Sequence, residues 1–168
     1  WLTRVGGLSP QAAAAGLFVI NLSMLFTFMG WGMAMPHLVK RGLDAARLMT
    51  WGVPVALALL ALNIALGADA GPWHWAAWCV SCSVVSLSQP AVGMAFPTAQ
   101  AGRALSAFNL VIFSGVFALQ WGIGLAVDAL VAAGLPEPQA MRFAFGVFWC
   151  GSVVSYLAFW RGGRASRP

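Results

Sequence analysis

The chain alternates between long runs of apolar residues and short segments that carry charges, glycine and proline. Each run has about the twenty residues that a helix needs to cross the hydrocarbon core of a bilayer. The pattern therefore predicts an all-α integral membrane protein with five transmembrane helices. These helices are predicted over about residues 11–35, 48–66, 73–95, 104–127 and 141–160.

The run over 104–127 has the clearest features of a membrane helix. Its 24 residues, between Arg103 and Asp128, include no charged side chain. As a helix they extend roughly 36 Å, enough to cross a core of about 30 Å with some tilt. Small residues recur in it at four-residue steps, and such a ridge lets another helix approach closely in lipid. The predicted helix-packing residues are Ser114, Ala118, Gly122 and Ala126.

Composition supports the membrane interpretation. The chain is 61% hydrophobic and 8% charged, whereas soluble domains carry about 25% charged residues. The lipid bilayer is therefore the first expected partner. The isoelectric point near 10.1 would also suit a nucleic-acid-binding protein. However, the basic residues form no stripe with interleaved aromatic residues, so nucleic acid is not an expected partner.

The basic residues indicate an orientation. They lie in short loops between apolar runs, and short cytoplasmic loops are enriched in lysine and arginine. With the 36–47 loop in the cytoplasm, the fragment begins in the periplasm and its C-terminus is cytoplasmic. The cytoplasmic charges are then Lys40, Arg41, Asp44, Arg47, Arg103, Arg161, Arg164 and Arg167, and the periplasmic charges are Arg4, Asp69, Asp128, Glu137 and Arg142.

Polar side chains concentrate in the first, third and fourth runs, as expected if these helices line a solute pathway. Hydrogen bonding between helices is the alternative role for the same side chains. No acidic or basic residue lies mid-membrane, so any proton coupling uses other helices, or the solute is neutral or moves by facilitated diffusion. The candidate pathway residues are Asn21, Thr27, Ser86, Gln89, Asn109 and Gln120.

The third run has two further features. Trp73, Trp75 and Trp78 open it and are typical of the aromatic belt at a membrane interface. Its second half is rich in serine, and Pro90 follows these serines. Because proline leaves a backbone carbonyl one turn earlier without a donor, we expect a kink near residues 86–90.

Catalytic and metal-binding patterns are weak. Cys79 and Cys82 have the CxxC spacing, but neither a second pair nor a thioredoxin-like context accompanies them. Two buried thiols one helical turn apart are the simpler interpretation. The sequence contains no nucleophile–histidine–acid pattern, phosphate-binding loop or metal motif. We therefore expect no enzymatic activity, no metal and no cofactor.

The fourth run also resembles a known family. The FP...AGRALSAFN opening, the FSGVFALQWGIG body and the closing Asp128 are similar to the eleventh helix of bacterial major facilitator superfamily permeases. The similarity extends over nearly the whole chain, as helices eight to twelve of that fold. The other segments match mainly in length, order and polarity.

The resemblance implies that residues 1–168 are the C-terminal bundle of a secondary transporter. The bundle's first helix and the whole N-terminal half would be missing, and the sequence does begin at Trp1 rather than methionine. The protein would lie in the bacterial inner membrane and move a small solute of unknown identity by alternating access. Its partner would be the N-terminal half of the same polypeptide.

The resemblance also suggests a role for three cations. Lys40, Arg41 and Gly42 fit the basic loop of the family, although Met35 and Pro36 stand where an acidic residue is expected. Lys40, Arg41 and Arg103 would form a cytoplasmic gate, and Arg103 is also placed to contact lipid headgroups. The competing hypothesis is a small stand-alone membrane enzyme or assembly subunit, which would use the serine-rich third helix or the two cysteines.

Overall fold

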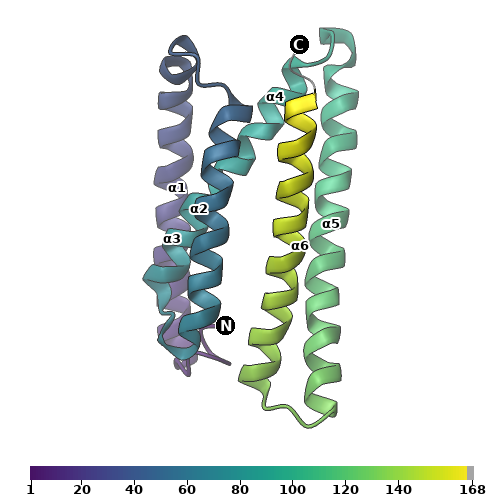
Figure 1. Ribbon diagram of the computed structural model, residues 1–168. Coiled ribbons are helices and arrows are strands. Elements are labelled where there is room, and N and C mark those ends of the chain that lie inside the picture. The colour runs from purple at the N-terminus through teal and green to yellow at the C-terminus, as the bar shows by residue number, and fades with distance from the viewer. Residues whose placement is uncertain (166–168) are drawn as a thin grey trace.

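The computed structural model describes residues 1–165 of the chain, with side chains through residue 162, and its described part is helical without strands (Figure 1). Of the predicted cytoplasmic cations, Arg167 lies outside the described residues and the side chain of Arg164 is not described. The helices are α1 (Pro10–Lys40), α2 (Ala45–Leu66), η1 (Gly67–Asp69), α3 (Pro72–Cys82), η2 (Ser83–Leu87), α4 (Ser88–Met94), α5 (Thr98–Ala132) and α6 (Glu137–Ala165), where η marks a 3₁₀ helix.

Four helices of the described chain are long and apolar enough to cross a membrane, namely α1, α2, α5 and α6. They correspond to four of the five predicted runs and extend beyond each of them. Helix α1 continues through Pro36 to Lys40, so the predicted 36–47 loop is reduced to a short turn before Ala45. Helices α1, α5 and α6 end later than predicted because a helix can continue past its apolar run, whereas α2 ends at Leu66 as predicted.

The predicted helix over 73–95 is not continuous, since the 3₁₀ segment η2 separates α3 from α4. Four serine hydroxyls donate to carbonyls three residues earlier in the chain, at 2.6–2.8 Å. In addition, Pro90 has no N–H for the carbonyl of Ser86. Both effects favour tighter turns than those of an α-helix. The irregular segment lies at 83–87, about one turn before the expected kink at 86–90.

The helices form two groups (Figure 1). Helices α1, α2 and α3 pack together, α5 and α6 form a hairpin, and contacts of α6 with α2 and of α4 with α5 join the groups. The main core cluster surrounds Trp1, Leu60, Trp75 and Phe145, with aromatic ring centroids 5.1–5.8 Å apart. Large apolar side chains on the outside, such as Phe117 at 70% exposure, are suited to contact with lipid.

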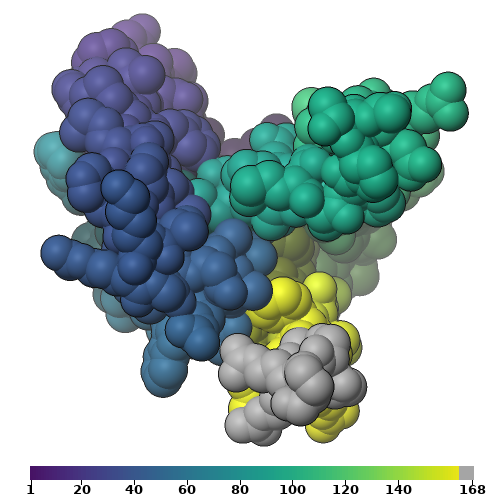
Figure 2. Space-filling model, turned by 90° about the horizontal axis from the view of Figure 1, so that it is seen from above, coloured from purple at the N-terminus to yellow at the C-terminus, as the bar shows by residue number. Residues whose placement is uncertain are grey.

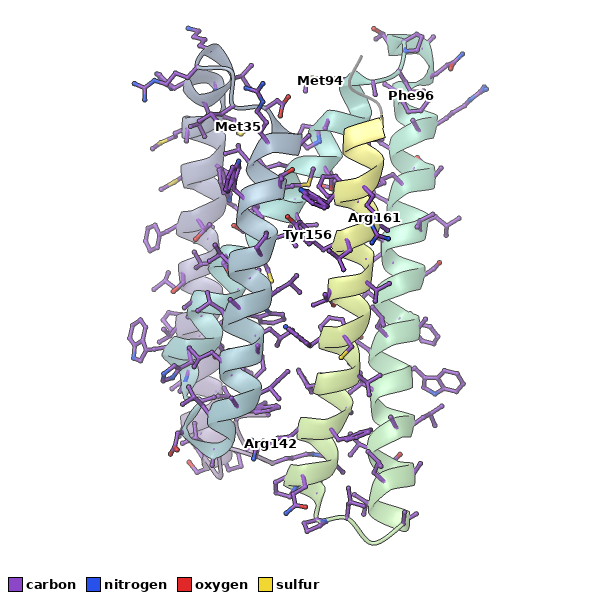
Figure 3. All side chains as sticks on the ribbon, viewed as in Figure 1. Met35, Met94, Phe96, Arg142, Tyr156 and Arg161 are labelled. Carbon is purple, nitrogen blue, oxygen red and sulfur yellow. The ribbon has the colours of Figure 1, made fainter. Side chains whose placement is uncertain are left out.

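Three side chains of α6 donate hydrogen bonds to backbone carbonyls of the antiparallel helix α2. Donors and acceptors both recur every seven residues, so the contacts follow one stripe on each helix. Figure 3 shows Arg142 and Tyr156 near the two ends of this α2–α6 ladder. Arg142 bonds to Ile64 and Ala65 at 3.0 and 3.1 Å, Trp149 to Leu57 at 2.8 Å, and Tyr156 to Thr50 at 2.9 Å.

The last contact of the ladder compensates for a proline. Pro54 lies inside α2 and has no N–H, so the carbonyl of Thr50, four residues earlier, lacks its helical donor. The hydroxyl of Tyr156 donates to this carbonyl instead. A carbonyl without a partner is costly in lipid because no water can reach it. The proline in α2 therefore creates a requirement that the tyrosine in α6 meets.

We expect Tyr156→Phe to lower the unfolding free energy by about 1 kcal/mol, because it leaves the Thr50 carbonyl without a donor. Pro54→Ala restores an N–H in α2, so the tyrosine substitution should cost less in that background. The four variants of this cycle can be compared by reversible unfolding in bicelles. An equal cost of Tyr156→Phe in both backgrounds would contradict the compensation.

Candidate functional site

Two of the candidate pathway residues, Gln89 of α4 and Asn109 of α5, contact each other directly. The Nε2 atom of Gln89 donates to Oδ1 of Asn109 at 2.9 Å. One turn further along each helix, Gly93 faces Leu105, and a Cβ atom at Gly93 would lie 3.4 Å from Leu105 Cδ1. A Cβ atom at Gly93 would thus be in ordinary van der Waals contact with Leu105, and α4 and α5 pack closely beside the two amides.

The Gln89–Asn109 pair keeps unused hydrogen-bonding capacity. A carboxamide has two N–H donors and one carbonyl acceptor, and the single bond between them leaves Oε1 of Gln89 and Nδ2 of Asn109 without another partner in the described chain. Gln89 is exposed and Asn109 is half-buried. The pair can therefore both accept from and donate to a polar solute or a water molecule.

The other candidate pathway residues are not joined to this pair. Asn21 donates to Leu17 at 2.8 Å and Thr27 donates to Ser23 at 2.7 Å, both within α1. Ser86 donates to the carbonyl of Ser83 at 2.7 Å within η2. Gln120 is exposed on α5 and has no hydrogen-bond partner among the described residues. Of the six, the structure brings together only Gln89 and Asn109.

The helices that carry these residues border a recess. Figure 2, which views the molecule from above, shows the purple-to-blue lobe of α1 and the green lobe of α5 with an open recess between them. Asn21 and Thr27 belong to the first lobe, and Asn109 and Gln120 belong to the second. Helix α4, which carries Gln89, packs against α5.

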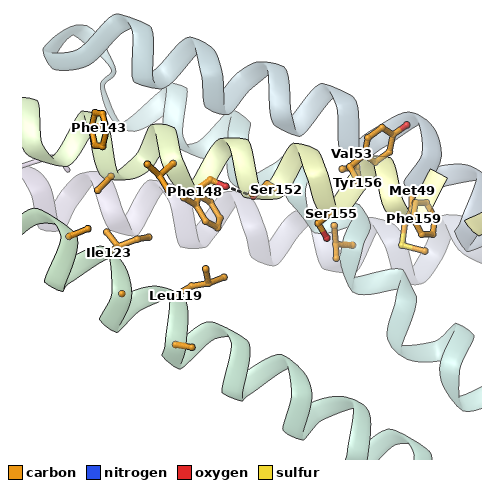
Figure 4. A pocket seen from close by; sticks show the side chains of 17 residues that line it. Met49, Val53, Leu119, Ile123, Phe143, Phe148, Ser152, Ser155, Tyr156 and Phe159 are labelled. Atoms are coloured by element: carbon orange, nitrogen blue, oxygen red, sulfur yellow. Dashed lines mark hydrogen bonds between the residues drawn. The ribbon is translucent and has the colours of Figure 1, made fainter. Parts of the chain in front are cut away.

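The predicted small-residue ridge of α5 lines a different space. Ala118, Gly122 and Ala126 face an apolar cavity of about 820 Å³, which α5 shares with α6 and the first half of α2 (Figure 4). Ser114 is not among its lining residues. All four small residues are exposed. Within the described chain, the ridge therefore borders a cavity and is not covered by a helix.

The three predicted gate cations lie at one end of the bundle. Lys40 ends α1, Arg41 follows it, and Arg103 lies in the second turn of α5. All three are exposed, and none has an ion-pair or hydrogen-bonding side-chain partner in the described part of the chain. Met35, where the resemblance led us to expect an acidic residue, lies inside α1.

Several polar contacts were not anticipated from the sequence. The indole N–H of Trp31 donates to the Ser83 hydroxyl at 2.8 Å and so joins α1 to η2. Asn63 is fully buried, and its Nδ2 atom lies 3.3 Å from the carbonyl of His74. Trp75, predicted at the interface, is only 7% exposed, whereas Trp73 is 72% exposed. The heptad spacing of Arg142, Trp149 and Tyr156 was the visible signal for the α2–α6 ladder.

The cysteines form no site in the described residues. Cys79 and Cys82 are half-buried, Cys150 is exposed, and all three are free thiols. No group of three histidine, cysteine or acidic side chains in this part of the chain could hold a metal ion.

Comparisons with protein families, curated proteins and solved structures gave no significant match to this chain.

Removing the bond between Gln89 and Asn109 tests whether the pair holds α4 against α5. In a double-mutant cycle of Gln89→Leu and Asn109→Leu, we expect a coupling of about 0.6 kcal/mol, with an upper bound near 1.7. Gln120→Leu is the matched control, because Gln120 has no hydrogen-bond partner among the described residues and its substitution should combine additively with Gln89→Leu. Unfolding free energies in bicelles give both values, and additivity in the first cycle would show that the bond is not formed.

Proposed function

We propose that the chain is the C-terminal bundle of a secondary transporter of the major facilitator type in a bacterial inner membrane. In this proposal it moves a small solute by alternating access, together with an N-terminal half of the same polypeptide. The solute passes along the recess between α1 and α5, beside α4. The observation that carries the proposal is the Gln89–Asn109 pair, which joins the short helix α4 to α5 beside this recess.

The broken third span supports five membrane crossings. The 23 residues from Pro72 to Met94 would extend about 34 Å as a regular helix, which matches the hydrocarbon thickness. In Figure 1 the η1 turn and the α4–α5 turn lie at opposite ends of the bundle. Interrupted helices are tolerated at membrane depth where they line a cavity or are buried in protein. Transporters commonly use such helices at the solute site.

The distribution of polarity supports a pathway on one side of the bundle. Asn21, Asn109 and Gln120 are polar amides on α1 and α5, the two lobes that border the recess. Helix α6, in contrast, directs polar side chains at backbone carbonyls of α2 through the α2–α6 ladder. In this proposal, α2 and α6 form one wall of the bundle. The hydrogen-bonding groups for a solute are those of α1 and α5 beside the recess.

Reporter fusions test the five crossings. We expect green fluorescent protein to be fluorescent when fused after Gly42 or Phe96, and alkaline phosphatase to be active when fused after Ala70 or Gly134. The reason is that each of these turns lies at the end of a helix, and the ends alternate between the two membrane faces (Figure 1). Reports of the same side from the Ala70 and Phe96 fusions would exclude a crossing by α3, η2 and α4.

Cysteine accessibility tests the aqueous pathway without knowledge of the solute. In a background with serine at the native Cys79, Cys82 and Cys150, we expect a membrane-impermeant maleimide to label Asn109→Cys and Gln120→Cys. Maleimide reacts with the thiolate, which forms in water but not in lipid.

The control for this labelling is Leu110→Cys. Leu110 neighbours Asn109 and is 69% exposed, and we expect it to face lipid. Labelling of Asn109→Cys no faster than Leu110→Cys, in the native membrane, would contradict a pathway along α5.

A further inference from the structure

The two ends of the bundle differ in charge. Cations predominate at the end where α1 and α6 finish and α2 and α5 begin, and the opposite end is mixed. Figure 3 shows Arg161 in the part of α6 nearer the first end and Arg142 at the opposite end. The first end carries Lys40, Arg41, Arg47, Arg103, Arg161 and one acid, Asp44, and the second carries Arg4, Asp69, Asp128, Glu137 and Arg142.

The charges at the mixed end are largely used within the protein. Arg4 pairs with Glu137 at 2.6 Å, and Arg142 bonds to carbonyls that end α2. At the basic end, the Asp44 carboxylate caps α2 by accepting from the backbone N–H of Arg47 at 2.7 Å. The Arg47 guanidinium donates to the carbonyl of Gly42 at 2.7 Å. The only acid at this end is thus engaged, and no carboxylate pairs with the remaining cations of the described chain.

One of these cations lies in an amphipathic hollow. At the α4–α5 corner, an open surface hollow is lined by Phe96, Gln100, Arg103 and Ala104. Figure 3 shows Phe96 at this corner, near the end of the bundle. The guanidinium of Arg103 and the amide of Gln100 have no side-chain partner in the described residues. A cation and an amide beside apolar side chains, at the end of a membrane helix, match a ligand that is charged at one end and apolar at the other.

We propose that this hollow binds the headgroup of an anionic phospholipid. Arg103 contacts the phosphate, Gln100 bonds to headgroup oxygens, and Phe96 and Ala104 pack against the glycerol and the first carbons of the acyl chains. Lys40 and Arg41 raise the local concentration of such lipids, because unpaired cations near a membrane surface attract anionic headgroups. Free phosphate is a poorer match, since it gains nothing from Phe96 and Ala104. The inference is independent of the proposed transport.

Native mass spectrometry of the detergent-solubilised protein tests this site. Titration with phosphatidylglycerol and with phosphatidylcholine gives the dissociation constant of the first bound lipid. We expect phosphatidylglycerol to bind more tightly, and Arg103→Gln to weaken its binding about fivefold, the effect of one cation near the headgroup. Binding of phosphatidylcholine should weaken less, because its choline cation offsets the charge of its phosphate. Equal binding of the two lipids, or no effect of Arg103→Gln, would overturn the proposal.

Two variants and a competitor sharpen the test. Arg4→Gln removes an exposed arginine at the opposite end and should leave phosphatidylglycerol binding unchanged. A similar loss in Arg4→Gln would show that net charge, and not the hollow, determines binding. Phe96→Ala should also weaken lipid binding, since it removes the apolar wall. Displacement of the lipid by millimolar inorganic phosphate would overturn the lipid assignment in favour of a simple anion site.

Discussion

The carbonyl groups of α2 constrain how the rest of the bundle can pack. In a bilayer, a carbonyl that loses its helical donor must find another one within the protein. Pro54 creates such a carbonyl at Thr50, and Tyr156 of α6 bonds to it. The same stripe of α6 bonds to α2 through Trp149 and Arg142. The register of α6 against α2 is thus set by hydrogen bonds at both ends and in the middle, and not by apolar packing alone.

This register determines where the molecule is rigid and where it is irregular. Helices α2 and α6 join the two groups of helices along most of their length. Between the groups, η2 interrupts the helix predicted over 73–95. Its serine hydroxyls compete for backbone carbonyls, and Pro90 has no N–H to donate. The short helix α4 packs against α5, where Gln89 bonds to Asn109 and Gly93 lies against Leu105.

The polar side chains differ in what they bond to according to their surroundings. Those of α6 meet backbone requirements of α2, and those of η2 bond within their own turn. The amides of α4 and α5 bond to each other and retain capacity for a further partner. At the basic end, Arg103 has no partner in the described residues. A solute pathway beside α4 and a lipid headgroup at the α4–α5 corner would use the groups that the fold itself leaves available.

The sequence by itself determined the helical class and the positions of four long helices, because the length of an apolar run is set by the bilayer thickness. It also singled out Gln89 and Asn109 as polar residues in membrane segments. Only the tertiary structure decided that these two meet, that Tyr156 bonds to Thr50, and that a 3₁₀ turn interrupts the helix predicted over 73–95. The five-span count and the solute pathway stay predictions. Contacts between residues far apart in sequence depend on helix register, which apolar periodicity in lipid specifies poorly because every face of a helix can be apolar.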